Sequence, residues 1–143
     1  MRSLLLLSSF LLILTGSAYA QKNGVAEEFA NLEEYPRFPG CAATAGDAED
    51  KEECAEVRML QHIYSNLKYP DAAKQQNIQG VVTARFTVEA SGKVSNPKIQ
   101  KGIGGGCDEE VVRLINEMPV WDPGKTGGVA QPADYVMSIK FSM

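Results

Sequence analysis

The stretch that decides the fold reads VVTARFTVE over residues 81–89 and is followed by the turn sequence ASGK over residues 90–93. Apolar and polar side chains alternate along it, and this period of two predicts a strand with one buried face. The buried face should carry the apolar side chains of Val82, Ala84, Phe86 and Val88. Because Gly92 suits the positive φ that tight turns require, the chain is expected to reverse there into a hairpin.

The returning strand is expected over residues 94–100. Pro97 has no N–H to contribute to a ladder, so this strand should lie at a sheet edge or carry a bulge. Residues 125–133 are expected to form a loop. A third strand is predicted over residues 135–141, where apolar and polar side chains again alternate. With the first strand at the centre of the sheet, the last strand should have a free edge.

Helices are predicted between these strands from apolar side chains at helical spacing. The first covers residues 55–67, and its expected apolar stripe consists of Val57, Leu60, Ile63, Tyr64 and Leu67. His62 falls outside this stripe and is expected to be solvated. A short helix follows over residues 71–76, and a third begins after the glycine-rich residues 102–106 with Asp108 as its N-cap. This order predicts an α+β fold, a small two-layer sandwich in which a three-stranded antiparallel sheet packs against helices.

The composition limits the classes of function. The chain has 143 residues, a length that suits one domain. Its 14 Lys and Arg residues against 18 Asp and Glu leave a formal net charge of −4. This balance argues against binding to nucleic acid, whose phosphates are held by clustered Lys and Arg, and against a polybasic membrane-surface binder. The hydrophobic fraction of 44% is too high for a disordered chain.

The N-terminus has the layout of a secretory signal peptide. A short basic start precedes an apolar run over residues 4–14, and Ala18-Tyr19-Ala20 forms a cleavage pattern. The alternative is a membrane anchor, which needs about 20 apolar residues, more than this run provides. We therefore expect a signal peptide at residues 1–20, an extended polar tail at residues 21–40 and one domain at residues 41–143.

Export places the three cysteines in an oxidising compartment, where disulfides persist. Cys41 and Cys54 flank a polar segment, and a bridge between them would close a loop without a core of its own and stabilise it by about 3 kcal/mol. The alternative is a zinc site formed by the three cysteines and His62, but the chain lacks the C-x-x-C pair typical of such sites. Cys107 is then a spare thiol.

Patterns for catalysis or cofactor binding are present only in part. Gly124-Lys125-Thr126 resembles the end of a phosphate-binding loop, but Pro119 stands where that motif has its first glycine. Gly102-x-Gly104 begins like a dinucleotide-binding fingerprint, but Cys107 stands at the third glycine position. His62 is the single histidine, and no G-x-S-x-G elbow accompanies it. We expect no enzymatic activity, no metal site and no cofactor.

An ordered set of residues along the chain resembles the C-terminal domain of TonB. It comprises Tyr69-Pro70, Ala73, Ile78-x-Gly80-x-Val82, Phe86-x-Val88, Gly92-x-Val94, the run from Gly102 to Glu110, Met118-Pro119-x-Trp121-x-Pro123-Gly124-Lys125 and the strand that ends at Phe141. Ahead of it, the motifs Pro36-Arg37-Phe38-Pro39-Gly40-Cys41 and Glu53-Cys54 are similar to those of the TonB-like proteins common in Bacteroidetes. The resemblance covers residues 36–143.

This resemblance implies a periplasmic domain that binds outer-membrane TonB-dependent receptors in energy-coupled transport. A short receptor segment, the TonB box, adds a strand to an exposed sheet edge in this mode of recognition. The matching edge is the last strand, with the residues Tyr135, Val136, Met137, Ser138, Ile139, Lys140 and Phe141. A proline at Ile139 would remove a backbone donor from this strand and should weaken binding.

The chain also departs from the pattern of TonB. TonB keeps an N-terminal membrane helix that engages ExbB and ExbD, so these two proteins are expected partners only if residues 1–20 are retained. Gly128-Val129-Ala130-Gln131-Pro132 replaces a tighter Gly-x-Pro pattern of the family. The alternative function is an exported interaction or scaffold module that binds another protein, or pairs with itself as a homodimer, without energy transduction.

Overall fold

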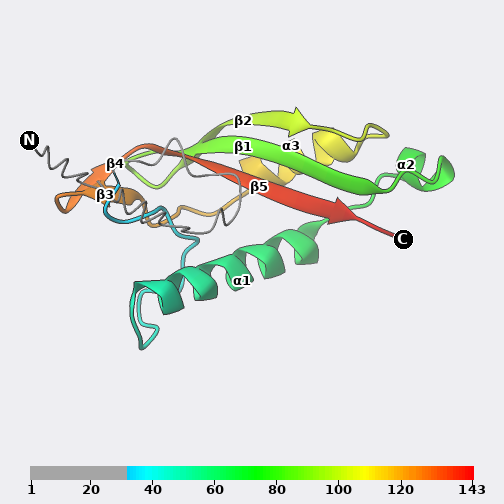
Figure 1. Ribbon diagram of the computed structural model, residues 1–143. Helices are drawn as coiled ribbons and strands as arrows, with labels where there is room; N and C mark the ends of the chain where they lie inside the picture. The colour runs from blue at the N-terminus through cyan, green and yellow to red at the C-terminus, as the bar shows by residue number, and fades with distance from the viewer. Residues whose placement is uncertain (1–31) are drawn as a thin grey trace, which may run out of the picture.

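The computed structural model describes residues 32–143 (Figure 1). Its elements in chain order are α1 (Ala48–Asn66), α2 (Asp71–Gln75), β1 (Gly80–Val88), β2 (Val94–Lys101), α3 (Cys107–Asn116), β3 (Gly124–Thr126), β4 (Val129–Gln131) and β5 (Ala133–Phe141). The expected signal peptide at residues 1–20 and most of the expected tail at residues 21–40 lie outside the described residues. Between residues 32 and 143, no helix has the length and apolar character needed to cross a bilayer.

β1 lies at the centre of a three-stranded antiparallel sheet in the order β2-β1-β5. Its pairing with β5 is regular over both strands, from Gly80 opposite Phe141 to Val88 opposite Ala133. The predicted fold class and the central position of β1 are therefore confirmed.

The pairing between β1 and β2 is irregular. Arg85 lies opposite Lys98 and Thr87 lies opposite Ser95, so β2 has one more residue than β1 between these two pairs. The extra length lies at Asn96 and Pro97, and Asn96 has a φ of +51°. β2 is thus both an edge strand and bulged, as expected of a strand that contains a proline.

The helices cover one face of the sheet, with α3 behind β1 and β2 and α1 alongside β5 (Figure 1). The predicted inward face of β1 is confirmed, because the side chains on it are fully buried: Val82, Ala84, Phe86 and Val88. β5 contributes buried side chains to the same core: Met137, Ile139 and Phe141. Full burial of an aliphatic or aromatic side chain stabilises the fold by about 1.5–3 kcal/mol, so this shared face holds the sheet and the helices together.

α1 begins at Ala48 rather than at Ala55. Asp47 is its N-cap and accepts hydrogen bonds from the backbone N–H groups of Glu49 and Asp50, while the Asp50 side chain accepts one from the N–H of Asp47. This reciprocal capping box supports a polar first turn that has no apolar periodicity. The polar segment between the two cysteines is therefore partly helical.

The predicted apolar stripe of α1 is wrong for two residues. The side chains of α1 that face the sheet are Ala55, Met59 and Ile63, spaced by four residues. Val57 and Tyr64 are about half exposed. His62 is partly buried and packs on Phe38, with 5.4 Å between ring centroids, so the prediction of a solvated histidine is also wrong.

α3 starts differently from the prediction as well. Its N-cap is Gly106, with a φ of +87°, and not Asp108. The Asp108 carboxylate instead accepts a hydrogen bond from the backbone N–H of Ile103 at 2.9 Å. Gly105 also has a positive φ, and a Cβ there would lie 2.7 Å from Cδ1 of Ile78. Glycine is needed at this close approach because it has neither a Cβ nor a penalty for positive φ.

Residues 32–40 are extended and lie against the domain. Glu34 and Lys125 form an antiparallel bridge, and Arg37 and Asp122 form a second one. Lys125 belongs to β3, which pairs with β4 as a two-stranded sheet. Residues 125–133 were expected to form a loop. These strands are short, with three residues each, so they carry little periodicity in the sequence.

Candidate functional site

The outer edge of β5 is the candidate site. Backbone groups of alternate residues in a strand point to opposite sides, and the N–H of Lys140 points away from β1 because it donates to the Tyr64 hydroxyl of α1. The outward-facing backbone groups of β5 therefore belong to Asp134, Val136, Ser138 and Lys140, and the backbone groups of the residues between them are directed at β1. Within residues 32–143, the outward backbone groups of Asp134, Val136 and Ser138 have no hydrogen-bond partner.

This edge is regular, and the opposite edge of the sheet is not. β5 runs for nine residues in continuous register with β1, which makes it about 30 Å long. β2 offers a shorter regular edge for pairing with a further strand, because it is bulged and because Pro97 has no N–H to donate. The β5 edge is thus the better of the two for accepting a further strand.

The side chains of β5 are largely committed to the fold. Met137, Ile139 and Phe141 are buried in the core, and the hydroxyl of Ser138 shares a hydrogen bond of 3.1 Å with the hydroxyl of Thr83 on the open face of the sheet. The edge therefore presents mainly its backbone. Since the backbone groups of Ile139 are directed at β1, a proline there would break the internal ladder and is a poor test of the outer edge.

α1 flanks the same edge. Near one end of β5, burial raises the pKa of the Tyr135 hydroxyl, and the negative charges of Glu56 and Glu52 on α1 raise it further. Near the other end, the Tyr64 hydroxyl lies 3.3 Å from the backbone nitrogen of Lys140. α1 comes close to β5 at its C-terminal end and diverges from it toward its N-terminus (Figure 1), so a strand added to this edge would meet the helix near Lys140.

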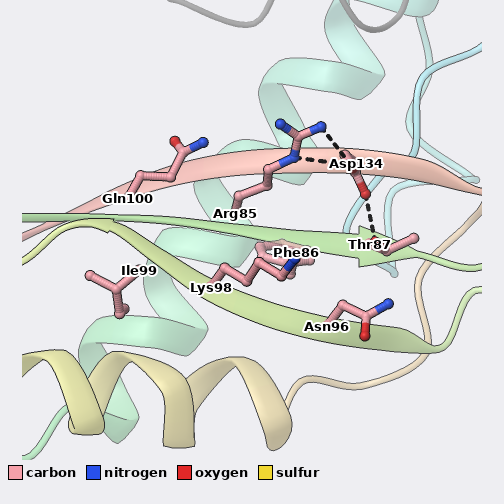
Figure 2. A pocket seen from close by; sticks show the side chains of 8 residues that line it. All are labelled: Arg85, Phe86, Thr87, Asn96, Lys98, Ile99, Gln100 and Asp134. Carbon is pink, nitrogen blue, oxygen red and sulfur yellow. Dashed lines mark hydrogen bonds and ion pairs between the residues drawn. The ribbon is translucent and has the colours of Figure 1, made fainter.

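The open face of the sheet has a depression of about 510 Å³ between β1 and the bulged part of β2. Figure 2 shows Arg85 and Thr87 directed toward Asp134 beside it. Both Nε and Nη2 of Arg85 donate to one oxygen of Asp134, at 2.9 and 2.7 Å, and the Thr87 hydroxyl donates to the other oxygen. The carboxylate thus joins β1 to β5.

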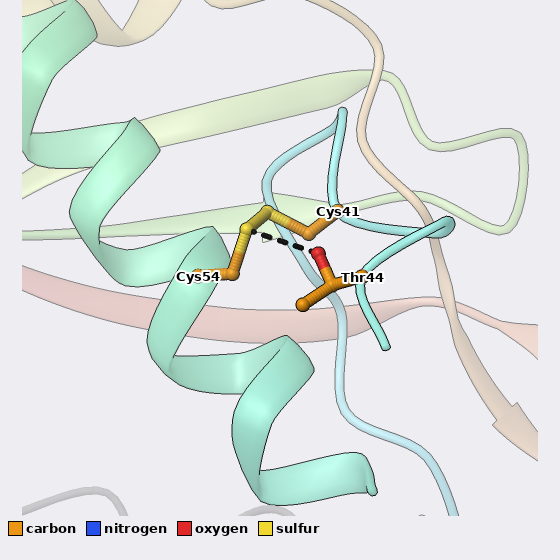
Figure 3. The surroundings of a disulfide bond; sticks show 3 residues. All are labelled: Cys41, Thr44 and Cys54. Atoms are coloured by element: carbon orange, nitrogen blue, oxygen red, sulfur yellow. Dashed lines mark hydrogen bonds between the residues drawn. A yellow bond between two sulfur atoms is a disulfide. The ribbon is translucent and has the colours of Figure 1, made fainter. Parts of the chain in front are cut away.

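A disulfide between Cys41 and Cys54 ties the N-terminal part of α1 to the segment that precedes it (Figure 3). The Thr44 hydroxyl donates to the Cys54 sulfur at 3.4 Å. Cys107 is a free thiol that is fully buried, and burial together with the charges of the acidic first turn of α3 raises its pKa. Among residues 32–143, no group of three His, Cys, Asp or Glu side chains could hold a metal ion.

A family model described as the C-terminal domain of the Gram-negative bacterial TonB protein matches residues 65–143. The chain belongs to this family. The matched region begins near the end of α1, so most of α1 and the disulfide precede the TonB C-terminal domain as the family defines it.

Two solution structures of the Helicobacter pylori TonB C-terminal domain are similar to this TonB C-terminal domain. The first has 19% sequence identity and a TM-score of 0.47, over 70% of this chain and 86% of that one. The second has 22% identity and a TM-score of 0.42, over 61% of this chain and 91% of that one. A search of curated proteins found no match.

Membership of the family establishes a general role. TonB C-terminal domains are periplasmic protein-interaction domains without enzymatic activity, and they contact outer-membrane receptors in energy-coupled transport. The candidate features for such a role in this chain are the β5 edge and the helix α1.

Proposed function

We propose that this chain is an exported, periplasmic protein-binding domain that engages outer-membrane TonB-dependent transporters in energy-coupled transport. A short transporter segment, the TonB box, pairs with the outer edge of β5 by strand addition. Residues 1–20 direct export and are removed, and residues 21–40 lead into the domain at residues 41–143. The family supports the general role.

The observation that carries the binding mode is the run of outward backbone groups at Asp134, Val136 and Ser138 that have no partner within residues 32–143. A strand laid along them forms hydrogen bonds at alternate residues, each with a net contribution of about 0.5–1.5 kcal/mol. The affinity then depends mainly on the backbone of β5, and the side chains of the peptide provide selectivity.

Two variants at one position test this mode. Ser138→Pro removes an outward N–H at an edge, where proline is tolerated in a strand. Ser138→Ala keeps that N–H and removes the hydroxyl that contacts Thr83, so it controls for the loss of the side chain. Labelled TonB-box peptides from the transporters of the same organism are titrated onto the mature chain and both variants.

We expect binding to the wild type and to Ser138→Ala with similar affinity, and binding to Ser138→Pro that is about tenfold weaker. Equal binding by the two variants would contradict recognition at the β5 edge. If no peptide binds, the transport role fails for this domain. Self-association that Ser138→Pro abolishes would then favour the homodimer or scaffold function.

The proposed export has a separate test. Intact-mass analysis of the protein from the native envelope should give the mass of residues 21–143. A mass that includes residues 1–20 would contradict cleavage and would make ExbB and ExbD candidate partners.

A further inference from the structure

One outward-facing donor of β5 differs from the rest. The backbone N–H of Lys140 donates to the hydroxyl of Tyr64, with 3.3 Å between nitrogen and oxygen. The outward backbone groups of Asp134, Val136 and Ser138 have no hydrogen-bond partner within residues 32–143. A strand added along β5 would use the Lys140 N–H in the same way, through one of its own carbonyl oxygens. The phenol oxygen of Tyr64 therefore occupies the position of that carbonyl.

The position of Tyr64 is set by a well-anchored helix. Its neighbour Ile63 is 1% exposed, and Met59 one turn earlier is 5% exposed, so the backbone of α1 cannot leave the sheet without opening the core. The Cys41–Cys54 disulfide fixes the helix further toward its N-terminus. The Tyr64 side chain is itself 47% exposed, so it can rotate into solvent while the helix stays in place.

Tyr64 also lies ahead of the part of the chain that the family model matches, which begins at residue 65. The hydroxyl reaches β5 from just outside this matched part, across a sequence separation of 76 residues. The contact is thus supplied by a residue of α1 directly ahead of the part that the family model matches.

We propose that Tyr64 is an internal competitor for the β5 edge, so that a peptide strand that reaches Lys140 must first displace its hydroxyl. This inference rests on the proposed strand addition and adds to it a residue that regulates affinity. In the free domain the phenol covers the end of the edge, and in the complex the peptide carbonyl replaces it.

The test uses Tyr64→Phe, which removes the hydroxyl and keeps the ring. Tyr35→Phe is the matched control, because Tyr35 is 46% exposed and lies in the segment ahead of α1. Two quantities are measured for the mature chain and both variants: the hydrogen-exchange rate of the Lys140 amide without peptide, and the dissociation constant of a TonB-box peptide long enough to span residues 133–141.

We expect Tyr64→Phe to accelerate exchange at Lys140 and to bind the peptide about threefold to tenfold more tightly, as the loss of one exposed neutral hydrogen bond predicts. Tyr35→Phe should change neither quantity. Unchanged exchange at Lys140 in Tyr64→Phe, or peptide affinity that is unchanged or weaker, would overturn the competition while leaving strand addition intact. Failure of the peptide to bind all three proteins would instead overturn the proposed function, and the competition with it.

Discussion

The carboxylate of Glu110 in α3 accepts a hydrogen bond from the backbone N–H of Lys68, 42 positions earlier in the chain, at 2.6 Å. Arg113 donates to the same carboxylate from Nε and Nη2, at 2.8 and 2.7 Å, and its Nη2 also donates to the carbonyl oxygen of Asn66. Glu110 is 8% exposed. This buried charge therefore joins the end of α1 to α3.

We predict that Glu110→Gln lowers the free energy of unfolding by about 2 kcal/mol, because hydrogen bonds to charged groups are worth about 1.5–3 kcal/mol. Urea unfolding at neutral pH measures the loss. Glu109→Gln removes a carboxylate from an exposed neighbouring position and should change stability by less than about 0.5 kcal/mol. An equal loss in both variants would show that the buried network is not the cause.

The same network predicts a dependence on pH. Burial alone would raise the pKa of Glu110, but the hydrogen bonds from Arg113 and from the N–H of Lys68, together with the positive charges of these two residues, outweigh it and lower the pKa below the ordinary value of 4.5. A lowered pKa in the folded state adds stability above the unfolded pKa, and this stability is lost as the pH falls. The difference in unfolding free energy between wild type and Glu110→Gln should be constant above about pH 5.5 and shrink progressively below about pH 4.5. A difference independent of pH would contradict this assignment.

Phe38 connects the extended N-terminal segment to the core. It is 7% exposed and packs edge-on against Trp121, with 5.7 Å between ring centroids. We predict that Phe38→Ala lowers the free energy of unfolding by about 3 kcal/mol, in the range of large-to-small core substitutions. Trp121 is the single tryptophan, so its fluorescence reports the transition. Tyr35→Ala, at a half-exposed position in the same segment, should cost much less, and equal losses would mean that the segment acts by some means other than burial of Phe38.

The cysteines predict a simple count. Labelling under denaturing, non-reducing conditions should find one free thiol per chain, at Cys107, because Cys41 and Cys54 are bonded.

In the folded protein Cys107 should react slowly with iodoacetamide at neutral pH, since it is buried and its raised pKa keeps it protonated. Replacing Cys41 and Cys54 by serine should lower the free energy of unfolding by about 3 kcal/mol. Three free thiols, or fast labelling of the folded chain, would contradict these assignments.

Much of the sheet can be predicted from the sequence because its signals are local. The alternation through Phe86 identifies the inward face of β1, and Pro97 marks the irregular strand. The start of α1 could not be found from apolar periodicity, since its first turn depends on the polar capping box of Asp47 and Asp50. Val57 and Tyr64 lie at helical spacing with the core residues of α1, and only the packing of α1 against β5 shows that they are about half exposed.

The sequence predicts the candidate edge only in part. Which strand has a free side follows from the order of regular and irregular strands. Which of its residues have outward backbone groups is set by the direction of the Lys140 N–H, and the contact between Tyr64 and Lys140 spans elements far apart in the chain. Neither leaves a local signal, so the sequence alone does not show that the backbone of Ile139 is directed at β1, which makes this residue unsuitable for a proline test of the outer edge.

The disulfide has a mechanical consequence. Tension that arrives along the backbone from the N-terminal side passes at Cys41 directly into α1 at Cys54, which lies 13 positions further along the chain. The intervening residues 42–53 do not bear this tension. The disulfide therefore prevents an extension of the chain by about 40 Å, at roughly 3.5 Å per residue. A force applied to the N-terminal segment therefore acts on α1, the helix that contacts β5, without first extending residues 42–53.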